Sequence, residues 1–82
     1  MASGTGTHVV SRQVFTFGTN HLHPVEGWCL RNYFVEAPAG MNHDEARVWV
    51  MDHFGINWAF QYPNRIEAGV DIWKLQLLEV NW

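Results

Sequence analysis

Two histidines in one short loop are the residues of this chain whose types and spacing come closest to a chemical site. His21 and His23 are separated by one residue, and Glu26 follows them in the stretch between Gly18 and Gly27. Imidazole nitrogens and carboxylate oxygens are ordinary zinc ligands, so this loop could hold a metal ion. The simpler interpretation, which we favour, is that both rings bond to the loop backbone and anchor the loop. A contact with a partner protein is the third possibility.

The other histidines and the single thiol are weaker candidates for a chemical site. His43 and His53 cannot bind one ion together in a single chain, because ten helical residues separate them by about 15 Å, whereas ligand bonds are about 2 Å long. Cys29, the only cysteine, lies between Trp28 and Leu30, which favours a buried structural thiol over a nucleophile. The sequence contains no nucleophile elbow, phosphate-binding loop or zinc-protease motif. We therefore assign no catalytic residue, cofactor or metal, and expect that the protein is not an enzyme.

Composition narrows the remaining classes of function. The 82 residues suit one domain, and 48% of them are hydrophobic and 15% aromatic. Aromatic strands can stack the bases of single-stranded nucleic acid, and this remains an alternative for five rings of this chain: Phe15, Phe17, Trp58, Phe60 and Tyr62. However, five Lys and Arg residues against eight Asp and Glu residues give a net charge of −3, which argues against a basic groove for phosphates. We expect the rings to pack in the core instead.

One helix is strongly indicated. Met41–Phe54 begins with Asn42 as N-cap and Glu45 three residues later, as in a capping box, and Gly55 follows as a stop signal. Its apolar face contains five residues at helical spacing: Ala46, Trp49, Val50, His53 and Phe54. Val48 and Met51 lie on the side away from Ala46 and Val50, and could form a docking surface.

Four segments are predicted to be strands because of alternating or β-branched patterns: Val9–Phe17, Trp28–Ala37, Ile56–Tyr62 and Val70–Val80. The last segment also fits a short helix through Ile72, Leu75, Leu77 and Leu78, and this alternative stays open. One helical turn over Arg65–Ala68 is possible in the loop before the last strand. Residues 1–8 are expected to be a flexible tail, and residues 9–82 a single domain. The predicted fold is α+β: a four-stranded, antiparallel-rich sheet with one helix packed on one face, in the order strand–strand–helix–strand–strand.

This arrangement leaves one sheet face without a helix. Period-two alternation assigns Trp28, Leu30 and Phe34 to that face, and predicts that Phe60 is buried under the helix. The uncovered rings need a cover, which the tail, the long loop or a second subunit would supply. We therefore expect that the domain does not work as an isolated monomer.

Several short motifs also resemble a family. They are Phe15-Thr16-Phe17-Gly18, Asn20-His21, Glu36-Ala37-Pro38, Ala46-Arg47, Phe54-Gly55 and Trp58-Ala59-Phe60-Gln61-Tyr62, and they resemble small uncharacterised proteins encoded by actinobacteria and their bacteriophages. The resemblance runs from about Phe15 to Gly69. It implies a phage or actinobacterial origin and no particular chemistry.

The sequence therefore predicts a protein–protein interaction module that binds a host or phage protein or forms a homodimer. A small enzyme or metal-binding protein using His21 and His23 is the first alternative, and a single-stranded nucleic-acid binder is the second. The free thiol, the absence of a signal-peptide pattern and the lack of a long apolar run favour the cytoplasm of the bacterial host. The candidate partner-binding residues are Trp28, Leu30, Phe34, Val48, Met51, His21 and His23.

Overall fold

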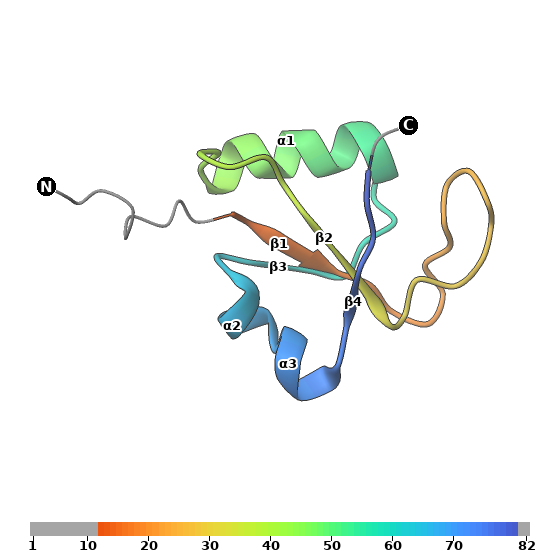
Figure 1. Cartoon of the computed structure of the whole chain (residues 1–82). Helices are drawn as coiled ribbons and strands as arrows, with labels where there is room; N and C mark the ends of the chain where they lie inside the picture. Colours follow the sequence, from red (N-terminus) through yellow and green to blue (C-terminus); the bar gives the residue numbers. More distant parts are fainter. Residues whose placement is uncertain (1–11, 81–82) are drawn as a thin grey trace, which may run out of the picture.

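A four-stranded mixed sheet with helices on both faces makes up the domain (Figure 1). The structure is a computed structural model that describes residues 12–80, so the predictions for residues 1–8 and for the start of the first strand lie outside the described residues. The strands are β1 (Val14–Thr16), β2 (Tyr33–Glu36), β3 (Phe60–Tyr62) and β4 (Gln76–Leu77). The helices are α1 (His43–Phe54), α2 (Arg65–Ala68) and α3 (Val70–Trp73).

The strands lie in the order β3-β1-β2-β4. β1 is antiparallel to both β2 and β3, and β4 is parallel to β2. β2 and β3 therefore run in the same direction on either side of β1, and α1 connects them. The prediction of an α+β fold with an antiparallel-rich, four-stranded sheet is confirmed. The prediction of a single helix is wrong, because the order of elements is β1-β2-α1-β3-α2-α3-β4.

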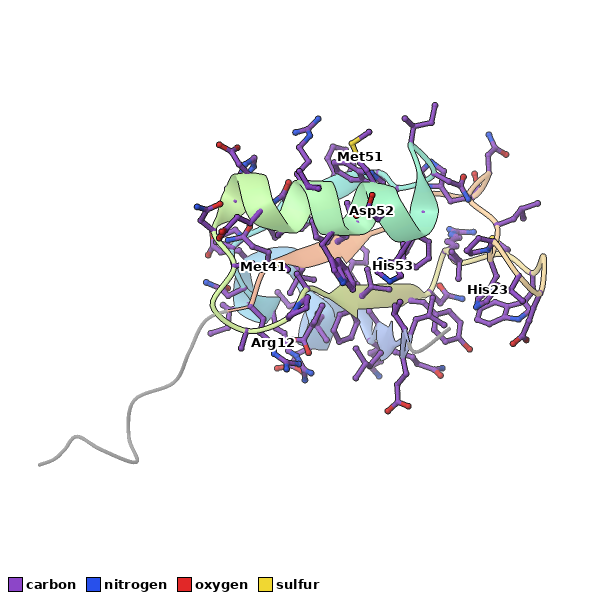
Figure 2. All side chains as sticks on the ribbon, turned by 90° about the horizontal axis from the view of Figure 1, so that it is seen from above. Arg12, His23, Met41, Met51, Asp52 and His53 are labelled. Carbon is purple, nitrogen blue, oxygen red and sulfur yellow. The ribbon has the colours of Figure 1, made fainter. Side chains whose placement is uncertain are left out.

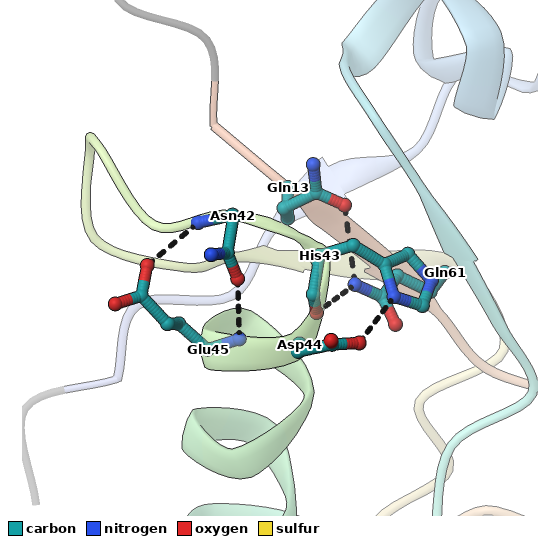
Figure 3. Close-up of polar contacts among 6 residues, drawn as sticks. All are labelled: Gln13, Asn42, His43, Asp44, Glu45 and Gln61. Carbon is teal, nitrogen blue, oxygen red and sulfur yellow. Dashed lines mark hydrogen bonds and ion pairs between the residues drawn. The ribbon is translucent and has the colours of Figure 1, made fainter.

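α1 begins as its sequence predicts. The Glu45 N–H donates to Asn42 Oδ1 at 2.8 Å, and the Asn42 N–H donates to Glu45 Oε1 at 3.0 Å, which completes the capping box (Figure 3). Gln61 Nε2 donates to the His43 carbonyl at 2.9 Å and to Gln13 Oε1 at 3.1 Å. These bonds fix the first turn of α1 against β3 and the residue before β1.

The larger core lies between α1 and the sheet. Phe15 and Phe17 face α1, as the alternation predicted, and the buried residues packed with them are Leu30, Val35, Ala37, Ala46, Val50, Phe54 and Leu78. The Trp58 ring meets Phe15 edge-on, with 5.2 Å between the ring centroids. Trp49 and His53 are half-buried at the border of this core, so the predicted apolar face of the helix is confirmed.

The second sheet face is covered by the chain itself. Val14, Phe34, Ala68 and Val70 form a smaller core there, with α2 and α3 packed against the sheet on the side opposite α1 (Figure 1). Asn64 Oδ1 caps α2 by accepting the Glu67 N–H at 2.8 Å. Gly69, with φ +72°, ends α2 in a left-handed conformation and starts α3. The prediction of a strand over the whole of Val70–Val80 is wrong, because this turn sends the chain into α3 and β4 is only Gln76–Leu77.

The sheet faces predicted for Leu30 and for Phe60 are also wrong, in both cases because the alternation of side chains is interrupted. A turn at Arg31 and Asn32 precedes β2, so Leu30 joins the core under α1 and only Phe34 lies on the second face. β3 begins at Phe60 rather than at Ile56. Its register pairs Phe15 with Gln61, so that Gln61 faces α1 while Phe60 and Tyr62 face the α2–α3 side. Phe60 is 62% exposed rather than buried under the helix.

Within residues 12–80, no helix combines the length and the apolar character that crossing a membrane requires.

Candidate functional site

The loop between Gly18 and Gly27 is held together by hydrogen bonds to the rings of His21 and His23, the two candidate metal ligands. His21 Nδ1 accepts the Gly18 N–H at 2.7 Å, and His23 Nδ1 accepts the N–H groups of Val25 and Glu26 at 3.1 and 2.9 Å. The His23 ring is buried and lies 4.9 Å from the Trp28 ring, centroid to centroid. The interpretation of both residues as loop anchors is confirmed. Figure 2 places His23 at one end of the molecule, with Arg12 and Met41 at the other.

The carboxylates and the thiol near this loop do not form a metal site with the two histidines. Residues 12–80 contain no group of three or more His, Cys, Asp or Glu side chains placed to hold one ion. Cys29 is exposed, and its thiol donates to the Thr19 carbonyl at 3.3 Å. The prediction of a buried Cys29 is wrong, because Leu22 and Cys29 form an isolated bridge in the loop instead of a strand within the sheet.

The predicted partner-binding residues divide into two groups. Leu30 and Phe34 are buried in the chain's own two cores, and Trp28 is half-buried between the rings of His23 and Tyr33, so the expectation that these three lie uncovered on one face is wrong. Val48 and Met51 are exposed on α1, as predicted. The five rings suggested for base stacking are also split: Phe15 and Phe17 pack in the core under α1, so their ring faces are not available for stacking on bases.

A larger apolar surface lies on the other side of the sheet. Four side chains there are mostly exposed: Phe60 at 62%, Ile66 at 85%, Ile72 at 79% and Trp73 at 73%. We call this set the α2–α3 surface, because three of its members lie on these helices and Phe60 faces the same side of the sheet. The helical turn predicted over Arg65–Ala68 is confirmed as α2, but the strand prediction for Val70–Val80 misplaced Ile72 and Trp73, which lie on α3. Gly69, which ends α2 and starts α3, was the signal that a second helical turn follows.

One cleft opens beside this surface, between the end of α3 and the loops at the end of β1 and the start of β2. It has a volume of about 350 Å³. Its lining residues are Thr16, Phe17, Gly18, Thr19, Arg31, Asn32, Tyr62, Ala68, Trp73 and Leu75. We call it the Trp73 cleft. The Trp73 ring lies directly over Gly69, where an added Cβ would approach Trp73 Cδ1 to 2.7 Å. The absence of a side chain at Gly69 is therefore what lets the indole pack there.

An ion pair attaches α2 to the sheet. Arg65 Nε and Nη2 donate to the two carboxylate oxygens of Glu36 at 2.6 and 2.7 Å, and Arg12 Nη1 lies 3.8 Å from Glu36 Oε1. The Glu36 side chain is only 8% exposed. Hydrogen bonding by Arg65, aided by the positive charges of Arg65 and Arg12 and opposed by burial, holds the pKa of Glu36 below its ordinary value. The Arg65 guanidinium also lies 5.2 Å from the centre of the Phe34 ring. Arg65 therefore contacts two residues of β2, Glu36 and Phe34, and joins α2 to this strand.

Comparisons with models of known protein families, with curated proteins and with solved structures gave no match.

Proposed function

We propose that this chain is a small interaction module, acting in the cytoplasm of a bacterial host, that binds a host or phage protein through the α2–α3 surface. The observation that supports the proposal is that Phe60, Ile66, Ile72 and Trp73 come from β3, α2 and α3 on one side of the sheet and have most of their surface exposed. Large exposed apolar side chains on one side of a domain are typical of protein–protein interfaces.

The energetics favour a partner at this surface. Burying one exposed Ile or Phe side chain contributes roughly 1.5–3 kcal/mol before the costs of association. The other exposed apolar residues of α1, Val48 and Met51, are two side chains on a helix whose neighbours Arg47 and Asp52 are charged and exposed. The α2–α3 surface therefore offers more apolar area for a partner to bury than the surface predicted from the sequence.

The α2–α3 surface differs from the uncovered sheet face that the sequence predicted for a homodimer. The expected homodimer was to bury Leu30 and Phe34, but both are already buried inside the chain. A second copy can still bind at the α2–α3 surface, and self-association is one outcome of the experiment below.

Affinity capture from an actinobacterial lysate, followed by mass spectrometry, tests the proposal with two matched double variants. Ile66→Ser with Ile72→Ser changes the α2–α3 surface, and Val48→Ser with Met51→Ser changes α1. We expect the same protein to be captured by the wild type and the α1 variant and to be lost from the α2–α3 variant. Sedimentation at micromolar concentration identifies the partner as a second copy if the wild type is a dimer and the α2–α3 variant a monomer.

The opposite pattern would contradict the proposed surface. If the α1 variant loses the captured protein while the α2–α3 variant keeps it, the module binds through Val48 and Met51. If both variants capture the same proteins as the wild type, neither surface is the binding site.

A further inference from the structure

The Trp73 cleft is lined by both aromatic and polar residues. Trp73 of α3 and Tyr62 of β3 contribute rings, and Leu75 and Ala68 are further apolar lining residues. Thr16, Thr19 and Asn32 are uncharged polar residues of the lining. A site of this composition suits a planar apolar group that carries a polar substituent at its edge.

The charge of the cleft differs from that of the whole chain. The chain carries a net charge of −3, yet none of the residues that line the cleft is Asp or Glu, and the one charged residue among them is Arg31. Arg31 is exposed and forms no ion pair with any residue in the range 12–80. The cleft therefore favours a ligand with a negative charge. A carboxylate is the group that the guanidinium fork binds best in proteins, apart from phosphate.

Size and position favour a segment of a protein over a large cofactor. The cleft volume of about 350 Å³ lies at the lower end of the range for ligand sites, which is about 300–1,000 Å³. Trp73 belongs both to the cleft lining and to the exposed α2–α3 surface, so a partner that covers Trp73 also contacts the cleft.

We propose that the Trp73 cleft binds an aromatic side chain of the partner that is followed directly by an acidic residue. The aromatic ring packs against Trp73 and Tyr62, and the carboxylate pairs with Arg31. This inference rests on the proposed function and goes beyond it by naming the chemistry that the partner presents.

The test uses the whole ¹⁵N-labelled chain and two short peptides that differ in one group. Acetyl-Gly-Trp-Asp-Gly-amide carries the carboxylate, and acetyl-Gly-Trp-Asn-Gly-amide is its neutral match. We expect saturable shifts in the amide signals of Gly18, Thr19 and Asn32. The acidic peptide should bind about fivefold more tightly, as expected for a strong exposed ion pair. Arg31→Gln should remove this difference, and Arg47→Gln, which changes the cation above Trp58, should preserve it.

Each remaining outcome decides against the inference. Equal binding of the two peptides, a preference that survives Arg31→Gln, shifts confined to other parts of the chain, or no saturable binding would each overturn it. Free N-acetyltryptophan binding more tightly than the acidic peptide would make the cleft a small-molecule site instead. If the capture experiment succeeds and the Arg31→Gln variant captures the partner as well as the wild type does, the proposed function stands and this inference fails.

Discussion

Replacing Glu36 by Gln tests the contact that holds the α2–α3 layer on the sheet. The carboxylate is 8% exposed and accepts two hydrogen bonds from Arg65, a half-exposed residue. A hydrogen bond to a charged group contributes about 1.5–3 kcal/mol to stability, but solvent screening at Arg65 reduces this. We therefore expect Glu36→Gln to lower the free energy of unfolding by about 1–2 kcal/mol. Each kcal/mol corresponds to a fall in Tm of about 4–8 °C in a domain of this size.

The effect should also depend on pH in a defined direction. Because Arg65 lowers the pKa of Glu36 in the folded chain, the folded state holds this proton less tightly than the unfolded state. The stabilisation is therefore fully present above the pKa of an unfolded-state glutamate, about 4.3. It is lost as the pH falls through the lower folded-state pKa. The difference in the free energy of unfolding between wild type and Glu36→Gln should therefore shrink as the pH falls below about 4.3.

Urea unfolding at pH 7 and at several acidic pH values, followed by circular dichroism, measures both effects. A double-mutant cycle with Arg65→Gln isolates the pair, and Asp52→Asn, a change to an exposed acid on α1, serves as the control with an expected change below about 0.5 kcal/mol. A coupling energy near zero, or a difference between wild type and Glu36→Gln that stays constant down to pH 3, would refute the reasoning.

Four further substitutions test the cores, the Gly69 turn and the α1 cap. Phe15→Ala should cost about 3–5 kcal/mol because the ring is fully buried, whereas Phe60→Ala should cost less than about 1 kcal/mol; equal shifts of the urea midpoint would contradict the assignment. Gly69→Ala should destabilise the chain and displace Trp73, since φ is +72° and the added Cβ would lie 2.7 Å from the indole; an unchanged Trp73 indole signal in NMR would count against this geometry. Asn42→Ala should lower the free energy of unfolding by about 1 kcal/mol through loss of the helix cap, and thermal unfolding identical to that of the wild type would show that the cap does not contribute.

The parts of the fold that could be predicted from the sequence are those encoded locally. Asn42, Glu45 and Gly55 mark the two ends of α1 with side-chain and backbone chemistry that acts within a few residues. The alternation of Phe15 and Phe17 with Val14 likewise assigned the faces of β1. These signals do not depend on any distant part of the chain.

The errors arose where tertiary structure interrupts a local pattern. The spacing of residues 70–80 fits a strand or a short helix, and the choice is made by the Gly69 turn and the docking of Ala68 and Val70 on Phe34. The turn at Arg31 and Asn32 and the late start of β3 each move side chains to the opposite face, because a shift of one residue reverses the alternation.

The candidate site could not be predicted for the same reason. The Trp73 cleft exists because the parallel pairing of β2 with β4 brings Leu75 and Trp73 beside Arg31 and Asn32, which are more than 40 residues earlier in the sequence. Composition gives only the share of hydrophobic residues, 48% of the chain. It could not indicate which of these side chains would be left exposed.

Hydrogen–deuterium exchange of the chain with and without the captured protein tests the central proposal most directly. We expect the partner to slow exchange in residues 60–75, which contain β3, α2 and α3, and to leave α1 unchanged. Protection of residues 43–54 in α1 with no change in residues 60–75 would contradict the proposal that the α2–α3 surface is the binding site.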